Sequence, residues 1–348
     1  MINCWYQQQE KGGLKTMSVT IKDIARLANV SHTTVSRALN NSPLIKEKTK
    51  QKILDIAAEM NYKPNFNAKS LVTQKSFTIG LFLTSLTDGT SSSFFADILR
   101  GVNKVIDENY NMFVRGIDDY HDFSSIHRNR YDGVILISQS ERDQAFLDHV
   151  LKQEIPVVVL NRKIEEQSVM NIVANENEGA NLAASHFIEN GHTRIAMVQG
   201  KEGFKSSQER KAGFLRALHT HDLPAKSEYM LRGDYTMKSG YSAMEALLKL
   251  EQPPTALFCA NDDMAIGAMN ALYANGKRCP EDMSIIGFDD IGFSAYTTPS
   301  LTTVKKPTEK ISMIGAESLL SLIENSRTET RQTLLSTELI IRNSVMRL

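Results

Sequence analysis

Short apolar runs alternate with amphipathic stretches over most of the chain, from Phe77 towards the C-terminus. The runs are rich in Val and Ile, which is typical of strands buried on both faces. The stretches between them, such as 239–250 (SGYSAMEALLKL), are amphipathic. The alternation predicts parallel sheets covered by helices on both faces. The predicted strands are 77–84, 110–116, 132–138, 155–161, 194–200, 255–261 and 283–290.

These strands form two sets, the first four and the last three. Two sets of this kind imply two lobes, and ligands of such folds bind beyond the carboxyl ends of the parallel strands. We therefore expect a binding cleft between the lobes.

From Thr20 to residue 63 the pattern predicts helices. Ile24, Ala25, Ala28, Val30, Val35 and Leu39 recur at spacings that place them on the facing sides of two short helices. Asn29 falls in the tight turn between them, where Asn tolerates a left-handed backbone, and Ser31 is a suitable N-cap for the second helix. The stretch 46–62 predicts a third helix, which completes a small helix-turn-helix head.

The second predicted helix exposes side chains that hydrogen-bond base edges or phosphates: His32, Thr33, Thr34 and Arg37. Lys46 leads the third helix and suits a phosphate backbone. The ordered string of residues, rather than any one of them, favours DNA binding over the alternative of a small basic bundle that binds no DNA.

The distribution of charge along the chain supports DNA binding by the head. The 348 residues have zero net charge, but residues 17–75 carry +6, residues 1–16 carry +1, and the remainder carries −7. A basic head on an acidic body indicates that the head meets a polyanion.

Several classes of protein are excluded by composition. No run approaches the ~18 apolar residues of a membrane span, and the start MINCWYQQQE lacks the pattern of a secretory signal. Cys4, Cys259 and Cys279 are too few and too scattered for a disulfide framework or a Cys-based zinc site. We therefore expect a protein of the reducing cytoplasm. Residues 1–16 have no hydrophobic period, and we interpret them as a disordered extension or a mis-assigned start, with Met17 as the expected first residue.

The string IKDIARLANVSHTTVSRALN followed by NYKPNFNAKSL resembles the head and hinge of the lac repressor (LacI/GalR) family, and the resemblance continues to ELIIRNS near the C-terminus. It implies a helix-turn-helix domain at 17–63, a hinge at 64–76, and an effector-binding and dimerisation domain at 77–348. The implied fold is an all-α head plus an α/β two-lobed, periplasmic-binding-protein-like body with parallel sheets.

The resemblance also implies how DNA is bound. Family members bind a near-palindromic double-stranded operator as a homodimer, and paired hinge helices insert a leucine into the minor groove, which kinks the duplex. Leu71 matches that leucine, although the family more often has Arg at the position of Lys69. The implied DNA-binding residues are Ser31, His32, Thr33, Thr34, Arg37, Asn40, Lys46, Ala68, Lys69 and Leu71.

A small effector, a sugar or sugar derivative, is implied for the cleft. The matching residues are Phe94 or Phe95, Asn161, Arg162, Arg210, Tyr235, Asn261 and Asp289. Aromatic faces that cover C–H patches, with amides, carboxylates and Arg for hydroxyls, suit a sugar. Asn261 is equally a helix N-cap, Phe95 equally a core residue, and Asp289 equally a turn residue. A helix-face arginine such as Arg210 needs a partner.

One stretch departs from the family pattern. Only about fifteen residues separate the strands 110–116 and 132–138, fewer than is usual in the family, so a short helix at best is expected there. His121 and His127 fall in this stretch without further metal ligands nearby. We expect no metal and no cofactor.

No catalytic motif is present: GxSxG, GxxxxGK[ST], HExxH and a strand-linked GxGxxG are all missing. The sequence therefore predicts a DNA-binding transcriptional repressor rather than an enzyme, with induction or corepression left open. Two alternatives stay open at this point: a regulator controlled by a phosphorylated carrier protein, and a solute-binding protein.

Overall fold

The computed structural model describes residues 19–39, 42–62, 75–324 and 332–348. The chain divides into two compact units between Thr73 and Gln74, and each unit is described by itself. Residues 1–16 and four predicted DNA-binding residues, Asn40, Ala68, Lys69 and Leu71, lie outside the described residues.

The first unit is built on helices α2 (Ile21–Ala28), α3 (His32–Leu39) and α4 (Glu47–Glu59). Their shared core consists of Ile24, Ala25, Ala28, Val35, Ala38, Ile53 and Ala57. Helix α2 ends at Asn29, whose φ of 55° is the expected left-handed turn. Ser31 caps α3, because its Oγ accepts from the Thr34 amide at 3.1 Å.

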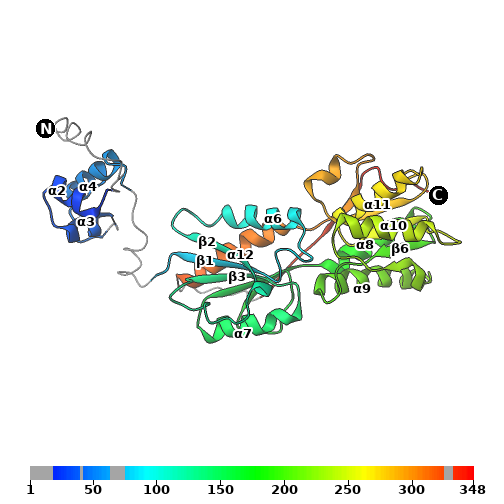
Figure 1. The fold of residues 1–348 in the computed structure, drawn as a ribbon, viewed down its shortest axis with the longest axis horizontal. Coiled ribbons are helices and arrows are strands. Elements are labelled where there is room, and N and C mark those ends of the chain that lie inside the picture. The colour runs from blue at the N-terminus through cyan, green and yellow to red at the C-terminus, as the bar shows by residue number, and fades with distance from the viewer. Residues whose placement is uncertain (1–18, 40–41, 63–74, 325–331) are drawn as a thin grey trace. The chain divides into compact units, whose positions relative to one another are not determined.

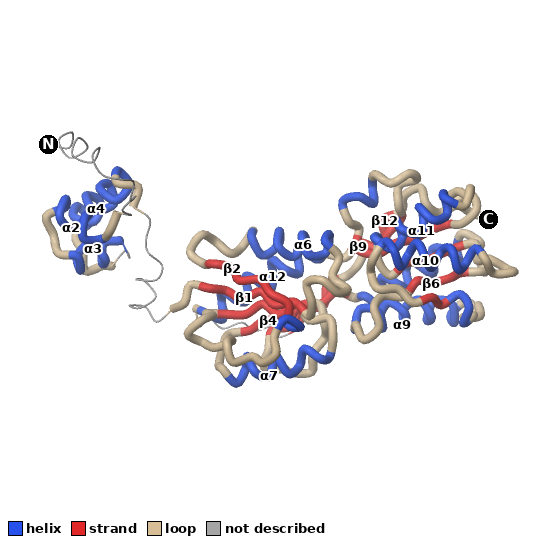
Figure 2. Tube along the Cα trace, viewed as in Figure 1, coloured by secondary structure: helices blue, strands red, loops and turns tan. Residues whose placement is uncertain are grey.

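The second unit contains two six-stranded sheets, which define lobe 1 and lobe 2 (Figures 1 and 2). The lobe 1 sheet has the order β11-β5-β4-β3-β1-β2, and all its strands are parallel. Helices α6 and α12 cover one face and α7 covers the other (Figure 1). The elements of lobe 1 are β1 (Thr78–Leu83), α6 (Ser92–Asn103), β2 (Asn111–Gly116), η1 (Ile117–Asp119), β3 (Gly133–Ile137), η2 (Glu141–Asp143), α7 (Gln144–Lys152), β4 (Val157–Leu160), β5 (Met170–Ala174), α12 (Thr308–Ile323) and β11 (Gln332–Leu335).

Lobe 2 repeats this plan with the order β12-β10-β9-β8-β6-β7, in which only β12 runs antiparallel to its neighbour. Two helix pairs pack on its sheet, α8 with α9 and α10 with α11. Its elements are α8 (Glu176–Glu189), β6 (Ile195–Val198), α9 (Lys205–Thr220), η3 (Ser227–Tyr229), β7 (Met230–Leu231), α10 (Met237–Leu248), β8 (Ala256–Cys259), α11 (Asp262–Ala274), β9 (Ser284–Asp289), η4 (Gly292–Ala295), β10 (Thr302–Lys305) and β12 (Glu338–Ile340).

A close approach between helices α8 and α9 positions part of the cleft. A Cβ at Gly213 would lie 1.9 Å from the backbone oxygen of Asn177, so only glycine permits this packing. Gly213 lies one turn beyond Arg210 on α9, and the approach brings Arg210 to the first turn of α8.

The predicted fold class is confirmed, with all seven predicted strands present. The pattern missed β5, because the buried Asn171 interrupts its apolar run, although the Asn171 amide is satisfied by the carbonyls of Val159 and Arg162. It also missed β7 and β12, which have two and three residues, and β10 and β11, in which polar residues interrupt the apolar run. The stretch 117–132 contains η1 and turns but no α-helix.

The chain crosses between the lobes after β5, after β10 and after β11. The second crossing contains Lys306 and Pro307, which join β10 of lobe 2 to α12 of lobe 1. No helix in the described part of the chain is both long and apolar enough to cross a membrane.

Candidate functional site: an inter-lobe cleft and a helix-turn-helix surface

A small cleft lies between the lobes, and its lining residues follow the carboxyl ends of strands in both sheets. This is where ligands bind in open α/β sheets. The lining residues are Gly89, Ser91, Phe94, Gln139, Asn161, Ser206, Arg210, Tyr235, Asn261, Asp289 and Lys306.

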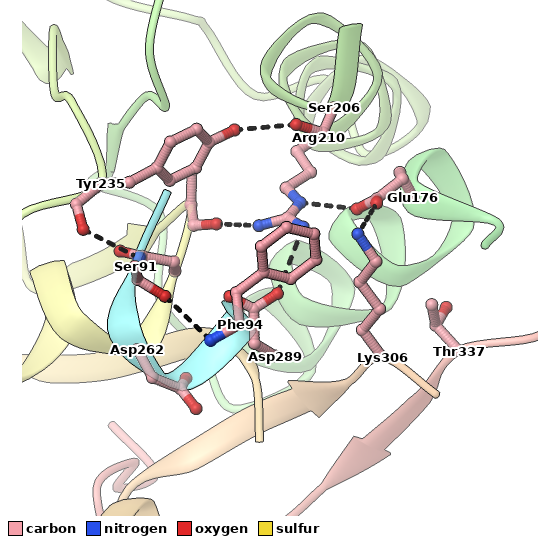
Figure 3. A network of polar contacts seen from close by, with 12 residues as sticks. Ser91, Phe94, Glu176, Ser206, Arg210, Tyr235, Asp262, Asp289, Lys306 and Thr337 are labelled. Carbon is pink, nitrogen blue, oxygen red and sulfur yellow. Dashed lines mark hydrogen bonds and ion pairs between the residues drawn. The ribbon is translucent and has the colours of Figure 1, made fainter. Parts of the chain in front are cut away.

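Arg210 is the centre of the lobe 2 wall and is almost fully buried. Its Nε donates to Glu176 Oε2 at 2.6 Å, Nη1 donates to the Ala260 carbonyl, and Nη2 donates to Asp289 Oδ1 at 3.3 Å (Figure 3). The guanidinium also lies 3.7 Å from the centre of the Phe288 ring. A guanidinium has five N–H donors, so each terminal nitrogen keeps one N–H for a ligand.

Glu176 pairs with two cations. Its Oε1 lies 2.7 Å from Lys306 Nζ, an ion pair rather than a well-aligned hydrogen bond. Burial would raise the pKa of Glu176, but Arg210 and Lys306 hold it below its ordinary value. The carboxylate therefore stays ionised and orients both cations.

Asp289, at the end of β9, is the second acid of this wall. Burial raises its pKa to about 6, although Arg210 and Lys306 oppose the shift. Asp289 has a φ of 108° and Asp290 a φ of 57°, so the chain turns sharply here. The buried Asp262 at the start of α11 holds this loop by accepting from the Ile291 amide at 2.9 Å and the Ser294 hydroxyl at 2.7 Å.

Tyr235 and Asn261 complete the lobe 2 wall. The Tyr235 hydroxyl lies 3.0 Å from Ser206 Oγ, and burial raises the pKa of Tyr235 to about 12. Asn261 donates through Nδ2 to the Tyr235 carbonyl at 3.0 Å, and its Oδ1 accepts from the Met264 amide at 3.0 Å. Asn261 is thus both the N-cap of α11 and a cleft residue.

Lobe 1 contributes uncharged groups to the cleft. Ser91 caps α6 by accepting from the Phe94 amide at 3.2 Å, and Phe94 faces the cleft from the first turn of that helix. Asn161, with a φ of 74°, follows β4 and donates to the Ser138 carbonyl at 3.2 Å.

Two predicted effector residues lie elsewhere. Phe95 packs on the lobe 1 core, as Phe94 also does, but unlike Phe94 it does not line the cleft. Arg162 is buried within lobe 1, where it donates to Ser138 Oγ at 2.7 Å and to Gln144 Oε1 at 3.3 Å. The structure therefore brings together Phe94, Asn161, Arg210, Tyr235, Asn261 and Asp289, but not Phe95 and Arg162.

The cleft is closed in this structure. Its interior leaves about 20 Å³ for the centre of a water-sized sphere, which is room for roughly one water molecule. The Lys205 amide of lobe 2 donates to the Gln139 carbonyl of lobe 1 at 2.9 Å, and Lys201 pairs with Asp88. A sugar therefore requires the lobes to separate or the side chains to rearrange.

Sequence reasoning missed Gly89, Ser91, Gln139, Glu176, Ser206 and Lys306. Two of them lie just beyond strands that the sequence pattern missed. Glu176 follows the N-cap Asn175 after β5, and Lys306 directly follows β10. A charged residue directly after a buried parallel strand is a candidate for the cleft.

The helix-turn-helix unit has an exposed polar face. Ser31, His32, Thr33 and Arg37 are exposed on or beside α3, and Thr34 is half-exposed, with its hydroxyl 2.9 Å from Ser31 Oγ. Lys46 is also exposed, at the N-cap of α4. No group of three or more metal-ligating side chains is found among the described residues.

A helix-turn-helix unit joined to a two-lobed body with a polar cleft defines a class, the ligand-controlled DNA-binding regulators. Residues 20–65 match the family "Bacterial regulatory proteins, lacI family", and residues 184–345 match a periplasmic binding protein-like domain. The "Probable HTH-type transcriptional repressor ExuR" of Bacillus subtilis (strain 168) is 60% identical over 330 residues, covering 95% of this chain and 99% of that protein. The "HTH-type transcriptional repressor PurR" of Aliivibrio salmonicida (strain LFI1238) is 34% identical and covers 94% of this chain and 99% of its own length. The chain belongs to the lacI family of bacterial regulatory proteins.

Solved structures of lacI family regulators are similar to this chain. The lac repressor dimer bound to operator and the anti-inducer ONPF has a TM-score of 0.79 and 26% identity, covering 95% of this chain and 100% of that chain. The complex of the regulator CelR with cellobiose has a TM-score of 0.71 and 27% identity, and the match covers 94% of this chain and 99% of that chain. A LacI family regulator from Enterococcus faecium with bound ribose has a TM-score of 0.69 and 27% identity, and the match covers 78% of this chain and 99% of that chain. The protein is accordingly a transcriptional repressor and not an enzyme.

Proposed function

We propose that this repressor binds a near-palindromic operator as a homodimer and is controlled by a sugar-like effector held between the lobes. The observation that carries the proposal is the cleft itself, in which Arg210, Asp289 and Asn261 face Phe94 and Asn161. Hydrogen-bonding groups opposite an aromatic face suit a polyhydroxylated ring. Because it acts on DNA, the protein belongs in the cytoplasm.

The solved relatives support an effector of this kind. CelR holds cellobiose, and the Enterococcus faecium regulator holds ribose. A sugar effector is therefore favoured over control by a phosphorylated carrier protein. The solute-binding alternative is not favoured, because the head and body together match a transcriptional repressor over nearly their whole length.

For the DNA surface, we infer that α3 enters the major groove, with His32 and Thr33 setting sequence preference and Arg37 contacting a guanine or a phosphate. Lys46 at the N-cap of α4 supplies a phosphate contact. The contacts proposed for Asn40, Ala68 and Lys69, and the minor-groove insertion of Leu71, lie outside the described residues and stay predictions.

A homodimer needs a surface that a second copy covers. Tyr273, Phe293 and Tyr296 of lobe 2 are 81%, 69% and 84% exposed. Large exposed aromatic side chains are typical of interfaces, and we expect the second copy to bury them.

Replacing Arg37 tests the DNA surface. If Arg37 reads a base, Arg37→Ala weakens binding to the specific operator by about 1–3 kcal/mol and leaves binding to random DNA nearly unchanged. Arg26→Ala is the control, because Arg26 is exposed on the neighbouring helix and paired with Asp23 at 3.1 Å. Fluorescence anisotropy on both duplexes measures the effect, and an equal loss on both would make Arg37 a phosphate contact.

Selection from random duplexes at moderate salt tests the proposal as a whole. We expect a near-palindrome to be enriched, and the enrichment to change when one member of a panel of monosaccharides and disaccharides is added. Sequence-independent, salt-sensitive binding under every condition would contradict the proposal.

A further inference from the structure

Lys306 lies where the lobes meet, in the crossing that joins β10 to α12. Its side chain is only 3% exposed. A lysine ammonium is seldom buried unless it is paired, so its partners indicate what it does.

The partners of Lys306 come from both lobes. From lobe 1, the Asn161 Oδ1 accepts a hydrogen bond from Nζ, and the centre of the Phe94 ring lies 5.1 Å from Nζ. From lobe 2, the Glu176 carboxylate pairs with Nζ at 2.7 Å (Figure 3). One ammonium thus joins the two walls of the cleft.

The groups that Lys306 contacts are also groups that can bind a sugar. An ammonium over an aromatic face makes a cation–π contact, and the C–H face of a sugar stacks on the same ring surface. Asn161 Oδ1 and Glu176 Oε1 are acceptors that suit hydroxyl donors. Lys306 therefore takes up, in the closed cleft, positions that an effector would otherwise fill.

We propose that Lys306 is an internal ligand of the cleft, which holds the lobes together without effector and which the effector must displace. Lys306 also determines specificity, because a displacing molecule has to offer hydroxyl donors to Asn161 Oδ1 and Glu176 Oε1 and an apolar face to Phe94. The displacement rests on the proposed sugar control, whereas the holding of the lobes does not.

Hydrogen exchange of the full-length, effector-free protein tests the holding of the lobes. The Lys205 amide reports closure, because it donates across the cleft to Gln139. In Lys306→Met we expect exchange in peptides covering Lys205 to be faster by about tenfold. Lys305→Met is the matched control, because it removes the same charge from an exposed neighbour and should leave exchange unchanged.

Exchange at Lys205 that stays at the wild-type rate in Lys306→Met would overturn the proposal. If circular dichroism shows that this variant is not folded, Lys306→Gln provides the same test, since it keeps hydrogen-bond donors but loses the charge.

Calorimetry with D-ribose, cellobiose and a wider sugar panel tests displacement. A sugar that binds the wild type should bind Lys306→Met about tenfold more tightly, because no internal ligand has to leave. A tenfold weaker affinity would show that the ammonium contacts the sugar and would overturn displacement. If no sugar binds the wild type, the proposed sugar control and displacement both fail, while the exchange result still decides the role of Lys306 in holding the lobes.

Discussion

The two walls of the cleft come from lobes of the same architecture but differ in their chemistry. Lobe 1 presents neutral groups, and lobe 2 presents buried charges that already satisfy one another. The lobe 1 residues are Ser91, Phe94, Gln139 and Asn161, and the charged residues of lobe 2 are Glu176, Arg210 and Asp289.

This difference indicates which wall keeps its geometry and which wall adapts to a ligand. Buried ion pairs are costly to break on one side, so Arg210 keeps its pairing with Glu176 and Asp289 whether or not ligand is present. Neutral donors and an aromatic ring are easily reoriented or re-stacked. We infer that lobe 2 orients the effector and that lobe 1 closes on it.

The largest expected effect comes from removing Arg210. Arg210→Ala leaves Glu176 and Asp289 buried without their main counter-charge, and we expect the free energy of unfolding of the body to fall by about 3–5 kcal/mol. Urea denaturation measures this change.

Arg216→Ala is the control for that change. Arg216 lies on the same helix and pairs with Glu178 of α8 at 2.6 Å, but both side chains are about half exposed. An exposed pair of this kind contributes at most about 1 kcal/mol. Equal losses in the two variants would show that the lobe 2 network is no stronger than a surface pair.

The next effect is a dependence on pH. The pKa of Asp289 is raised by burial to about 6 in the folded protein, from 3.8. The folded state therefore holds this proton more tightly than the unfolded state, so the contribution of Asp289 to stability is complete below pH 4 and is lost as the pH rises through 6.

Comparison with Asp289→Asn isolates this contribution. Between pH 4 and pH 7 we expect the free energy of unfolding of the wild type to fall by up to about 2–3 kcal/mol relative to that of the variant, because the pKa of Asp289 is raised by about two. Urea denaturation at each pH gives the difference, and a difference independent of pH would show that Asp289 is ionised throughout.

The smallest effect distinguishes neighbours in lobe 1. Phe94→Ala should weaken effector binding by about 1 kcal/mol, because the ring lines the cleft, and should also lower stability, because the ring packs on the lobe 1 core. Phe95→Ala should lower stability as well but leave effector binding nearly unchanged, because Phe95 packs on the lobe 1 core and does not line the cleft. Calorimetry and urea denaturation of both variants test the assignment, which fails if Phe95→Ala weakens the effector more than Phe94→Ala.

Much of the fold could be predicted from the sequence, because Val/Ile-rich strands and amphipathic helices are local patterns. The head could also be predicted, since Asn29 and Ser31 are local turn and cap signals that the structure confirms. The short strands β7 and β12 could not, because pairing with a neighbour rather than composition defines them.

The site was less predictable because it depends on contacts that are distant in sequence. Arg210 required a partner, yet nothing local pointed to Glu176, 34 residues away. Arg162 was expected in the cleft, but its guanidinium turns into lobe 1 towards Ser138. Lys306 could not be predicted as a cleft residue, because a lysine at a strand end is ordinarily solvated. Only its position between the lobes makes it part of the cleft.

One titration shows whether a sugar in the cleft controls binding to the operator. Affinity for the selected operator would be measured with and without the sugar that binds, in wild type and in Phe94→Ala. We expect the sugar to change operator affinity in wild type, and Phe94→Ala to need about five- to tenfold more sugar for the same change. A sugar response with the same midpoint in both proteins, or no response in wild type, would contradict this expectation.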